Sequence, residues 1–175
     1  MSKLKLATVW LDGCSGCHMS LLDLDEGILA VAEKADLVYG PLVDATEFPE
    51  DVDVTLVEGA VSSQEDLKRV QMIRSRTRVL VALGDCAVTS NVPSMRNSIP
   101  VGRMLQRIYI EGVDTAPGVP SDGVPVLLAQ ARPLHDFVAV DAHLPGCPPP
   151  PAAILAVLSD LLAGKKPSAA AVKFG

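Results

Sequence analysis

The chain opens on KLATVWL at residues 5–11, and this apolar run leads directly into DGCSGC at residues 12–17. A run rich in valine, leucine and tryptophan is typical of a buried β-strand. After the glycine-rich turn, four apolar residues recur at helical spacing: Leu21, Leu24, Ile28 and Ala32. A strand, a tight turn and a helix form the first half of a βαβ unit, so the N-terminus predicts a parallel α/β sheet.

The alternation of strands and helices continues through the first half of the chain. Short runs of apolar and β-branched residues predict three further strands, at residues 37–39, 52–57 and 79–83. Ser62, followed three residues later by Glu65, is a capping-box signature and predicts the start of a helix that reaches about Arg74. This order of elements favours a parallel sheet with helices on both faces.

The second half of the chain is less regular. Prolines and glycines are concentrated between residues 91 and 125, so we expect long loops there, around a short helix near residues 103–110. This segment is a candidate partner-binding insertion. A last strand is predicted at residues 137–140, and the prolines at 148–151 precede a helix that has one apolar face and ends at Gly164.

Length and composition limit the class of protein. A chain of 175 residues fits a single domain with its own core, and we expect one domain over residues 1–175 with a small-residue tail at 165–175. The N-terminus shows neither an apolar signal segment nor a twin arginine, and no apolar run approaches the ~18 residues of a membrane helix. The sequence therefore predicts no membrane span, a cytoplasmic location and reduced cysteines.

The charge of the chain argues against nucleic acid as a partner. The net charge is −6, whereas nucleic-acid-binding domains present a clustered basic surface. One group of basic residues does occur, and we interpret it as the solvated face of a helix that runs into a strand: Lys68, Arg69, Arg74, Arg76 and Arg78. Hydrophobic residues make up 49% of the chain, which indicates a partner surface that is buried in a complex.

Four cysteines carry most of the chemical information. Cys14 and Cys17 lie in the turn after the first strand, Cys86 follows the strand at residues 79–83, and Cys147 follows the last predicted strand. The carboxyl ends of parallel strands meet at one edge of a sheet, which is where α/β proteins bind their ligands. We therefore predict that the four thiols form one metal site and are not four separate buried side chains.

The identity of the metal follows less directly from the residues. Structural zinc sites usually pair two Cys-x-x-Cys knuckles, but Cys86 and Cys147 arrive singly. An iron–sulfur cluster spans a larger volume and suits thiolates from three separate turns, so we favour one 4Fe-4S cluster over zinc. A thioredoxin-like role for Cys14 and Cys17 stays open, although it leaves the other two cysteines unexplained.

Four segments together resemble the small subunit of nickel–iron hydrogenases: LDGCSGC at residues 11–17, VEGAV at 57–61, GDCA at 84–87 and PGCPP at 145–149. The resemblance runs in order over nearly the whole chain. It implies a flavodoxin-like domain in which Cys14, Cys17, Cys86 and Cys147 bind a 4Fe-4S cluster near the nickel–iron site of a separate large subunit. By this resemblance the chain relays electrons and does not itself cleave hydrogen.

Two absences narrow the resemblance. Many hydrogenase small subunits carry a C-terminal extension with further cysteines, exported ones carry a twin-arginine signal, and this sequence shows neither. What remains is similar to the short small subunit of cytoplasmic bidirectional, NAD-reducing hydrogenases, whose further partners are iron–sulfur and flavin diaphorase subunits. Two alternatives stay open: a zinc-binding structural or assembly module, and a quinone reductase subunit like that of respiratory complex I, which has two adjacent cysteines in place of Cys14 and Cys17.

Smaller expectations concern the residues beside the cysteines. Backbone amides of three glycines are expected to approach the cluster sulfurs: Gly13, Gly84 and Gly146. Glu58 is expected to bond amides of the cysteine loops, to pass protons, or to cap the amides of residues 59–63. His18 is expected to bond a sulfur, face a partner or be exposed. A flavodoxin-like fold also raises FMN as a cofactor, but no phosphate-binding glycine pattern supports it.

Overall fold

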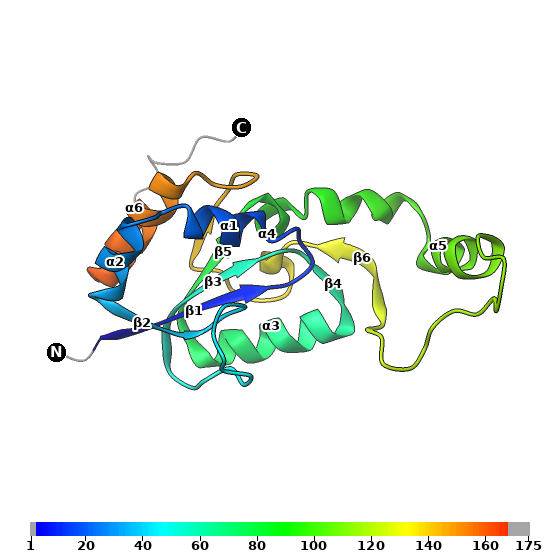
Figure 1. The fold of residues 1–175 in the computed structure, drawn as a ribbon, viewed down its shortest axis with the longest axis horizontal. Helices are drawn as coiled ribbons and strands as arrows, with labels where there is room; N and C mark the ends of the chain where they lie inside the picture. The colour runs from blue at the N-terminus through cyan, green and yellow to red at the C-terminus, as the bar shows by residue number, and fades with distance from the viewer. Residues whose placement is uncertain (1–2, 168–175) are drawn as a thin grey trace.

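The computed structural model describes residues 3–167 and shows a five-stranded sheet with helices around it (Figure 1). All five strands are parallel, in the order β2-β1-β3-β5-β7. Their bounds are Leu4–Trp10 for β1, Ala35–Tyr39 for β2, Val52–Glu58 for β3, Thr77–Leu83 for β5 and Ala142–Leu144 for β7. This is the strand order of flavodoxin-like proteins, so the predicted fold class is confirmed.

Helices cover both faces of the sheet (Figure 1). One face carries α1 (Gly16–Leu22), α2 (Gly27–Ala32) and α6 (Pro151–Leu162), and the other carries α3 (Gln64–Arg76). Neighbouring residues of a strand serve different layers, because successive side chains point to opposite faces. In β5, Val81 and Leu83 pack in the layer of α6, whereas Leu80 and Ala82 pack in the layer of α3.

The middle third of the chain builds a smaller, separate sheet. The strand β4 (Val61–Ser63) pairs antiparallel with β6 (Leu127–Arg132). Short helices accompany these strands: α4 (Asp85–Thr89), η1 (Val92–Ser98), α5 (Val101–Gln106), η2 (Arg107–Glu111) and η3 (Leu134–Asp136). The predicted helix near residues 103–110 is therefore confirmed as α5 and η2, and Figure 1 shows α5 extending away from the main sheet.

The predicted strand at residues 137–140 is wrong. The last strand of the main sheet is β7, and it joins β5 only after Asp141. The backbone N–H of Asp141 donates to the carbonyl of Leu80 at 2.9 Å, and the Asp141 carboxylate accepts from the N–H of Leu80 at 2.7 Å. Strand pairing therefore starts where an aspartate docks on β5, not where β-branched residues are most concentrated.

The predicted capping box is displaced by one residue. The hydroxyl of Ser63 accepts from the N–H of Asp66 at 3.1 Å, and the Asp66 carboxylate accepts from the N–H of Ser63 at 2.9 Å. Ser62 lies within β4 and is not the cap. The single helix expected after the first turn is also interrupted, because turns at residues 23–26 separate α1 from α2.

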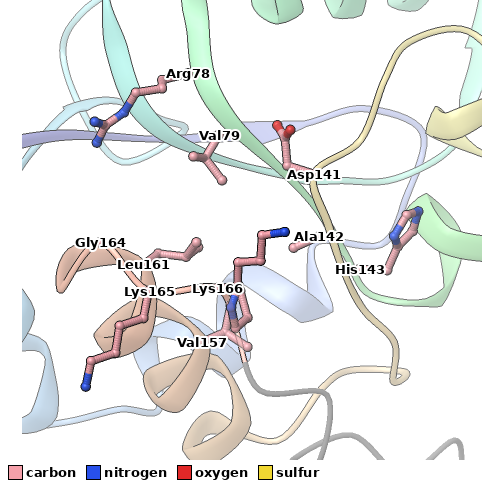
Figure 2. Close-up of a pocket in the computed structure, with 11 residues that line it drawn as sticks. Arg78, Val79, Asp141, Ala142, His143, Val157, Leu161, Gly164, Lys165 and Lys166 are labelled. Atoms are coloured by element: carbon pink, nitrogen blue, oxygen red, sulfur yellow. The ribbon is translucent and has the colours of Figure 1, made fainter.

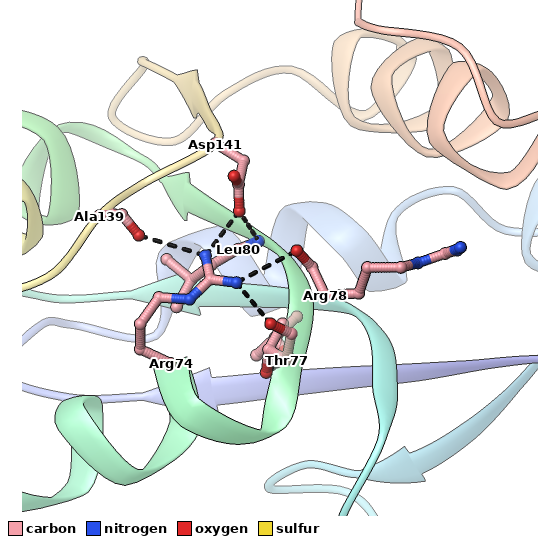
Figure 3. Close-up of polar contacts among 7 residues, drawn as sticks. Arg74, Thr77, Arg78, Leu80, Ala139 and Asp141 are labelled. Atoms are coloured by element: carbon pink, nitrogen blue, oxygen red, sulfur yellow. Dashed lines mark hydrogen bonds and ion pairs between the residues drawn. The ribbon is translucent and has the colours of Figure 1, made fainter.

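The interpretation of the basic group as a solvated helix face is also wrong in part. The guanidinium of Arg76 lies 2.8 Å from the carboxylate of Glu50, and Arg74 bonds several groups at the end of α3 (Figure 3). Within residues 3–167 no helix has the length and apolar character needed to cross a bilayer. Most of the predicted tail at residues 165–175 lies outside the described residues.

Candidate metal centre

Three loops bring the cysteines to one edge of the main sheet. Because β1, β5 and β7 are parallel, the loops that follow them leave the sheet at the same edge. Cys14 and Cys17 lie in the loop after β1 and the first turn of α1, Cys86 lies at the start of α4, and Cys147 lies between β7 and α6. The structure therefore brings together the four side chains that the sequence places at the carboxyl ends of strands.

A cavity of about 80 Å³ lies between these loops, and all four thiols line it. Each cysteine is free, so none of them is used in a disulfide. Cys17 and Cys86 are half-buried, while Cys14 and Cys147 are exposed. The site thus has an inner side that is closed by the fold and an outer side that is open at the surface.

Burial and close neighbours raise the pKa of two of the thiols. The pKa of Cys17 is raised mainly by burial, then by the negative charge of Glu58 and by the other three cysteines. The pKa of Cys86 is raised to about 11 by burial and by the nearby Cys147 and Cys14. The thiolate is the form that binds metals, so a bound cation must displace these protons and compensate the charge.

Two of the glycines allow the loops to close around the cavity. Gly84 has φ 81°, and a Cβ at this position would collide with the Sγ of Cys17. Gly146 has φ 136°, and a Cβ there would lie 2.6 Å from the Cα of Pro149. Both residues need conformations that only glycine adopts easily, so side chains are excluded where the loops of β5 and β7 meet.

Gly13 has a different role from the other two glycines, because it permits close contact between two loops. A Cβ on Gly13 would lie 3.2 Å from the Cα of Gly59 and 3.4 Å from Oε1 of Glu58. Gly146 lines the cavity, together with Gly16 and Gly59, which were not expected as site residues. Gly59 could have been predicted as a site residue, because it lies in the VEGAV segment directly after the buried strand β3.

Hydrogen bonds tie two of the cysteine loops to each other and hold the third to the loop after β3. The Asp85 carboxylate accepts from the N–H of Gly146 at 2.7 Å, and the N–H of Asp85 donates to the carbonyl of Gly146 at 2.9 Å. The loop after β1 is held to the loop after β3, because Asp12 and Ala60 exchange backbone hydrogen bonds of 3.2 and 2.8 Å. The positions of the cysteines are therefore fixed by the fold.

Glu58 and His18 form a buried pair beside the cysteine cavity. Glu58, at the end of β3, is 2% exposed and also lines the cavity. Its Oε2 accepts from the backbone N–H of His18 at 2.9 Å and lies 2.7 Å from the Nδ1 of the same residue. Of the roles expected for Glu58, bonding an amide of the cysteine loops is the one that the structure shows. His18 is 4% exposed, which contradicts an exposed position for it.

The donor set fits an iron–sulfur cluster. Four cysteine thiolates are the ligands of 4Fe-4S clusters, and here four thiols surround one cavity. The Nε2 of His18 is buried and has no hydrogen-bond partner among the described residues. Across residues 3–167, no group of three or more His, Cys, Asp or Glu side chains lies close enough together to hold one metal ion.

Comparison with protein families decides the classification. The protein family described as NADH ubiquinone oxidoreductase, 20 Kd subunit, matches residues 14–161 of this chain. This range includes all four cysteines. The chain belongs to this family. The part of the chain that matches the family runs from Cys14 in the loop after β1 to Leu161 in the last turn of α6.

Curated proteins that are similar in sequence to this chain are named as hydrogenase subunits. The chain is 36% identical over 168 residues to the NAD-reducing hydrogenase HoxS subunit delta of Cupriavidus necator, covering 93% of this chain and 80% of that one. It is also 36% identical over 165 residues to a subunit of the F420-non-reducing hydrogenase of Methanocaldococcus jannaschii, again covering 93% of this chain. It spans only 57% of the length of that second relative.

A solved structure agrees with this relationship. A chain in the crystal structure of an NAD+-reducing nickel–iron hydrogenase in the H2-reduced state superposes with a TM-score of 0.92 and 38% sequence identity. The match covers 99% of this chain and 100% of the other. The 20 Kd subunit family member described here therefore has the fold of a hydrogenase subunit over nearly all of its residues.

Proposed function

We propose that this chain is the electron-transferring small subunit of an NAD-reducing nickel–iron hydrogenase, and that it holds one 4Fe-4S cluster. Its proposed ligands are Cys14, Cys17, Cys86 and Cys147. The observation that carries the proposal is the cavity lined by all four thiols, in a chain that matches a subunit of such a hydrogenase over 99% of its residues. When bound, the cluster supplies one-electron transfer.

The chain's own residues would hold the ligands in place. Asp85 fixes the Cys86 loop to the Cys147 loop, and Glu58 fixes the backbone after Cys17. Because each bond involves a residue next to a cysteine, the backbone beside Cys17, Cys86 and Cys147 is positioned without a metal. Such preorganisation reduces the conformational entropy that is lost on binding.

The outer side of the cavity suits a protein partner. Cys14 and Cys147 are exposed, and two apolar side chains on the elements that flank the Cys14 loop are also exposed, Trp10 of β1 at 44% and Met19 of α1 at 58%. Exposed aromatic and methionine side chains are enriched in protein–protein interfaces. We propose that a large subunit with a nickel–iron centre covers this side of the cavity. In the same proposal, iron–sulfur and flavin diaphorase subunits receive the electrons, and the complex is cytoplasmic.

A zinc-binding module is a weaker candidate. Zinc holds four sulfurs at about 2.3 Å, so the sulfurs must converge on one point. Within residues 3–167, no three of the His, Cys, Asp and Glu side chains lie close enough together to hold one metal ion. The four thiols surround a cavity instead, which suits the larger volume of a cluster.

Co-purification tests the proposed function. The tagged chain, expressed in its native host under anaerobic conditions, should bring down a nickel-containing partner, and the complex should reduce NAD with hydrogen. The chain alone should be brown and contain about four iron atoms. A colourless chain that contains one zinc and no iron would refute the cluster.

The variant Cys147→Ala separates ligation from folding. It should lose the iron while retaining the circular dichroism of the parent, because Cys147 is exposed and lies outside the core. Ser159→Ala, a change in α6 away from the cavity, is the matched control and should retain the iron. A full iron content in Cys147→Ala would show that the proposed ligand set is wrong.

A further inference from the structure

A second and larger cavity lies where the start of β7 meets the end of α6 (Figure 2). Its volume is about 760 Å³, within the range of about 300–1,000 Å³ that is usual for small-molecule sites. Its lining includes three aliphatic side chains: Val79 of β5, and Val157 and Leu161 of α6. None of its lining residues is shared with the cysteine cavity.

The charged side chains around this cavity are mostly basic. Asp141 also lines it, but its carboxylate is already bonded to the guanidinium of Arg74 at 2.6 Å and to the N–H of Leu80 at 2.7 Å. Arg78 is paired with Asp53 at 3.1 Å. The charges of these two lining residues are therefore compensated from outside the cavity.

Lys165 and Lys166 remain as uncompensated positive charges. Within residues 3–167 neither lysine is in an ion pair. Figure 2 shows the Lys166 side chain extending toward Ala142 and Asp141, whereas the Lys165 side chain extends away from them. The whole protein has a net charge of −6, so two neighbouring free cations on one cavity run against the charge of the molecule. Such a local field attracts anions.

The walls of the cavity are held in position. Arg74 ties the backbone carbonyl of Ala139 and the carboxylate of Asp141 to the start of β5. His143 of β7 packs edge-on against His135 with 5.8 Å between ring centroids. Burial and the neighbouring His135 lower the pKa of His143, so this ring tends to be uncharged. A preformed cavity loses little conformational entropy when it takes up a ligand.

We propose that this cavity binds a small organic anion, with the apolar body of the ligand against Val79, Val157 and Leu161 and its anionic group at Lys166, while Lys165 adds positive charge at the rim (Figure 2). The aliphatic floor provides affinity through burial of apolar surface. The Lys166 ammonium, with the positive charge of Lys165 nearby, provides the selection for negative charge. The site shares no lining residue with the cysteine cavity, so this proposal can be tested independently of the proposed electron-transfer function.

Anilinonaphthalene sulfonate, an apolar ring system with one sulfonate, is a suitable probe. Titrated into the purified full chain, it should gain fluorescence with saturable binding that weakens with added salt. In the double variant Lys165→Glu and Lys166→Glu, the affinity should fall by about tenfold or more, because two attractive charges become repulsive. The matched control, Lys34→Glu with Lys68→Glu, reverses two exposed lysines elsewhere and should bind the probe as the parent does.

Three outcomes would overturn the proposal. The first is no saturable fluorescence gain in the parent chain. The second is equal binding by the parent and by the Lys165 and Lys166 variant, which would place the probe on another apolar surface. The third is binding to the isolated chain but not to the intact complex, which would show that a segment of a partner subunit occupies the cavity.

Discussion

Glu58 stands at a position where a carboxylate is costly. It is 2% exposed and lies at the end of a buried strand. Its Oε2 contacts both the backbone N–H and the Nδ1 of His18. A buried carboxylate without partners would destabilise the fold by several kcal/mol, so these contacts are needed for the residue to be retained. The same negative charge also raises the pKa of Cys17, which shows that it acts on the cysteine cavity.

We predict that Glu58→Gln raises the reduction potential of the bound cluster. Removing a negative charge near the ligands favours the more negative, reduced state, by on the order of 50 mV, since 59 mV corresponds to about 1.4 kcal/mol for one electron. The potential is measured by a redox titration followed by electron paramagnetic resonance. Glu47→Gln, a change at an exposed residue, is the control, and an equal potential in both variants would contradict the prediction.

Cys86 gives a prediction for the metal-free chain. Folding raises the pKa of Cys86 from 9.0 to about 11, so the folded state retains its thiol proton at pH values where the unfolded state has lost it. The contribution of Cys86 to stability is therefore fully present below pH 9 and is lost as the pH rises from 9 toward 11. Urea unfolding at about pH 8, below this window, and at about pH 10.5, in its upper part, should show a larger loss of stability for the parent than for Cys86→Ser. An equal loss in both would mean that other groups account for it.

At the scale of elements, Arg74 joins the end of α3 to two strands. Its guanidinium donates to the carbonyls of Thr77, Arg78 and Ala139 and to the Asp141 carboxylate (Figure 3). Asp141 in turn accepts from the N–H of Leu80, so one side chain links α3, β5 and the approach to β7. The short strand β7 depends on this link, because only three residues pair it with β5.

We predict that Arg74→Ala lowers the free energy of unfolding by roughly 2–3 kcal/mol, because carbonyls and a carboxylate lose a charged donor. The expected loss is measured by urea denaturation of the metal-free chain. Arg103→Ala, on the exposed side of α5, is the control and should change the free energy by less than about 0.5 kcal/mol. Equal effects of the two substitutions would show that the link at Arg74 is unimportant.

At the scale of the molecule, stability depends on two apolar layers, one on each face of the sheet. Leu158 of α6 is fully buried in one of them, whereas Leu29 of α2 is 65% exposed. We predict that Leu158→Ala lowers the free energy of unfolding by about 2–5 kcal/mol through the cavity that it leaves. Leu29→Ala should be almost neutral in the same urea measurement, and a small effect of Leu158→Ala would mean that α6 contributes little to the core.

Several main features of the fold could be predicted from the sequence, because apolar periodicity is a local property. The strand at residues 5–11 and the apolar face of α6 were found in this way. Other features depend on distant partners. The segment LLAQAR of β6 has no β-branched residue and becomes a strand through pairing with β4, while β7 starts where Asp141 docks on β5.

In the candidate site, too, local sequence features could be predicted, whereas contacts between distant residues could not. The four cysteines were found because each follows a strand, and parallel strands bring such loops together. The burial of His18 against Glu58 could not be predicted, since 40 residues separate them and neither has a local motif. The role of the cysteines as ligands stays a prediction until iron is measured.

The spread of the cysteines along the chain has a consequence for biosynthesis. On the proposed donor set, the first two ligands are made early, but the last lies in the loop after β7, just before α6. The loop of Cys147 is held through Gly146 by Asp85, so it takes its position only once β5 and β7 are paired. If these four cysteines are the ligands, the complete donor set forms only after β7 and the Cys147 loop have left the ribosome, and a nascent chain stalled before that loop would offer three of the four thiols.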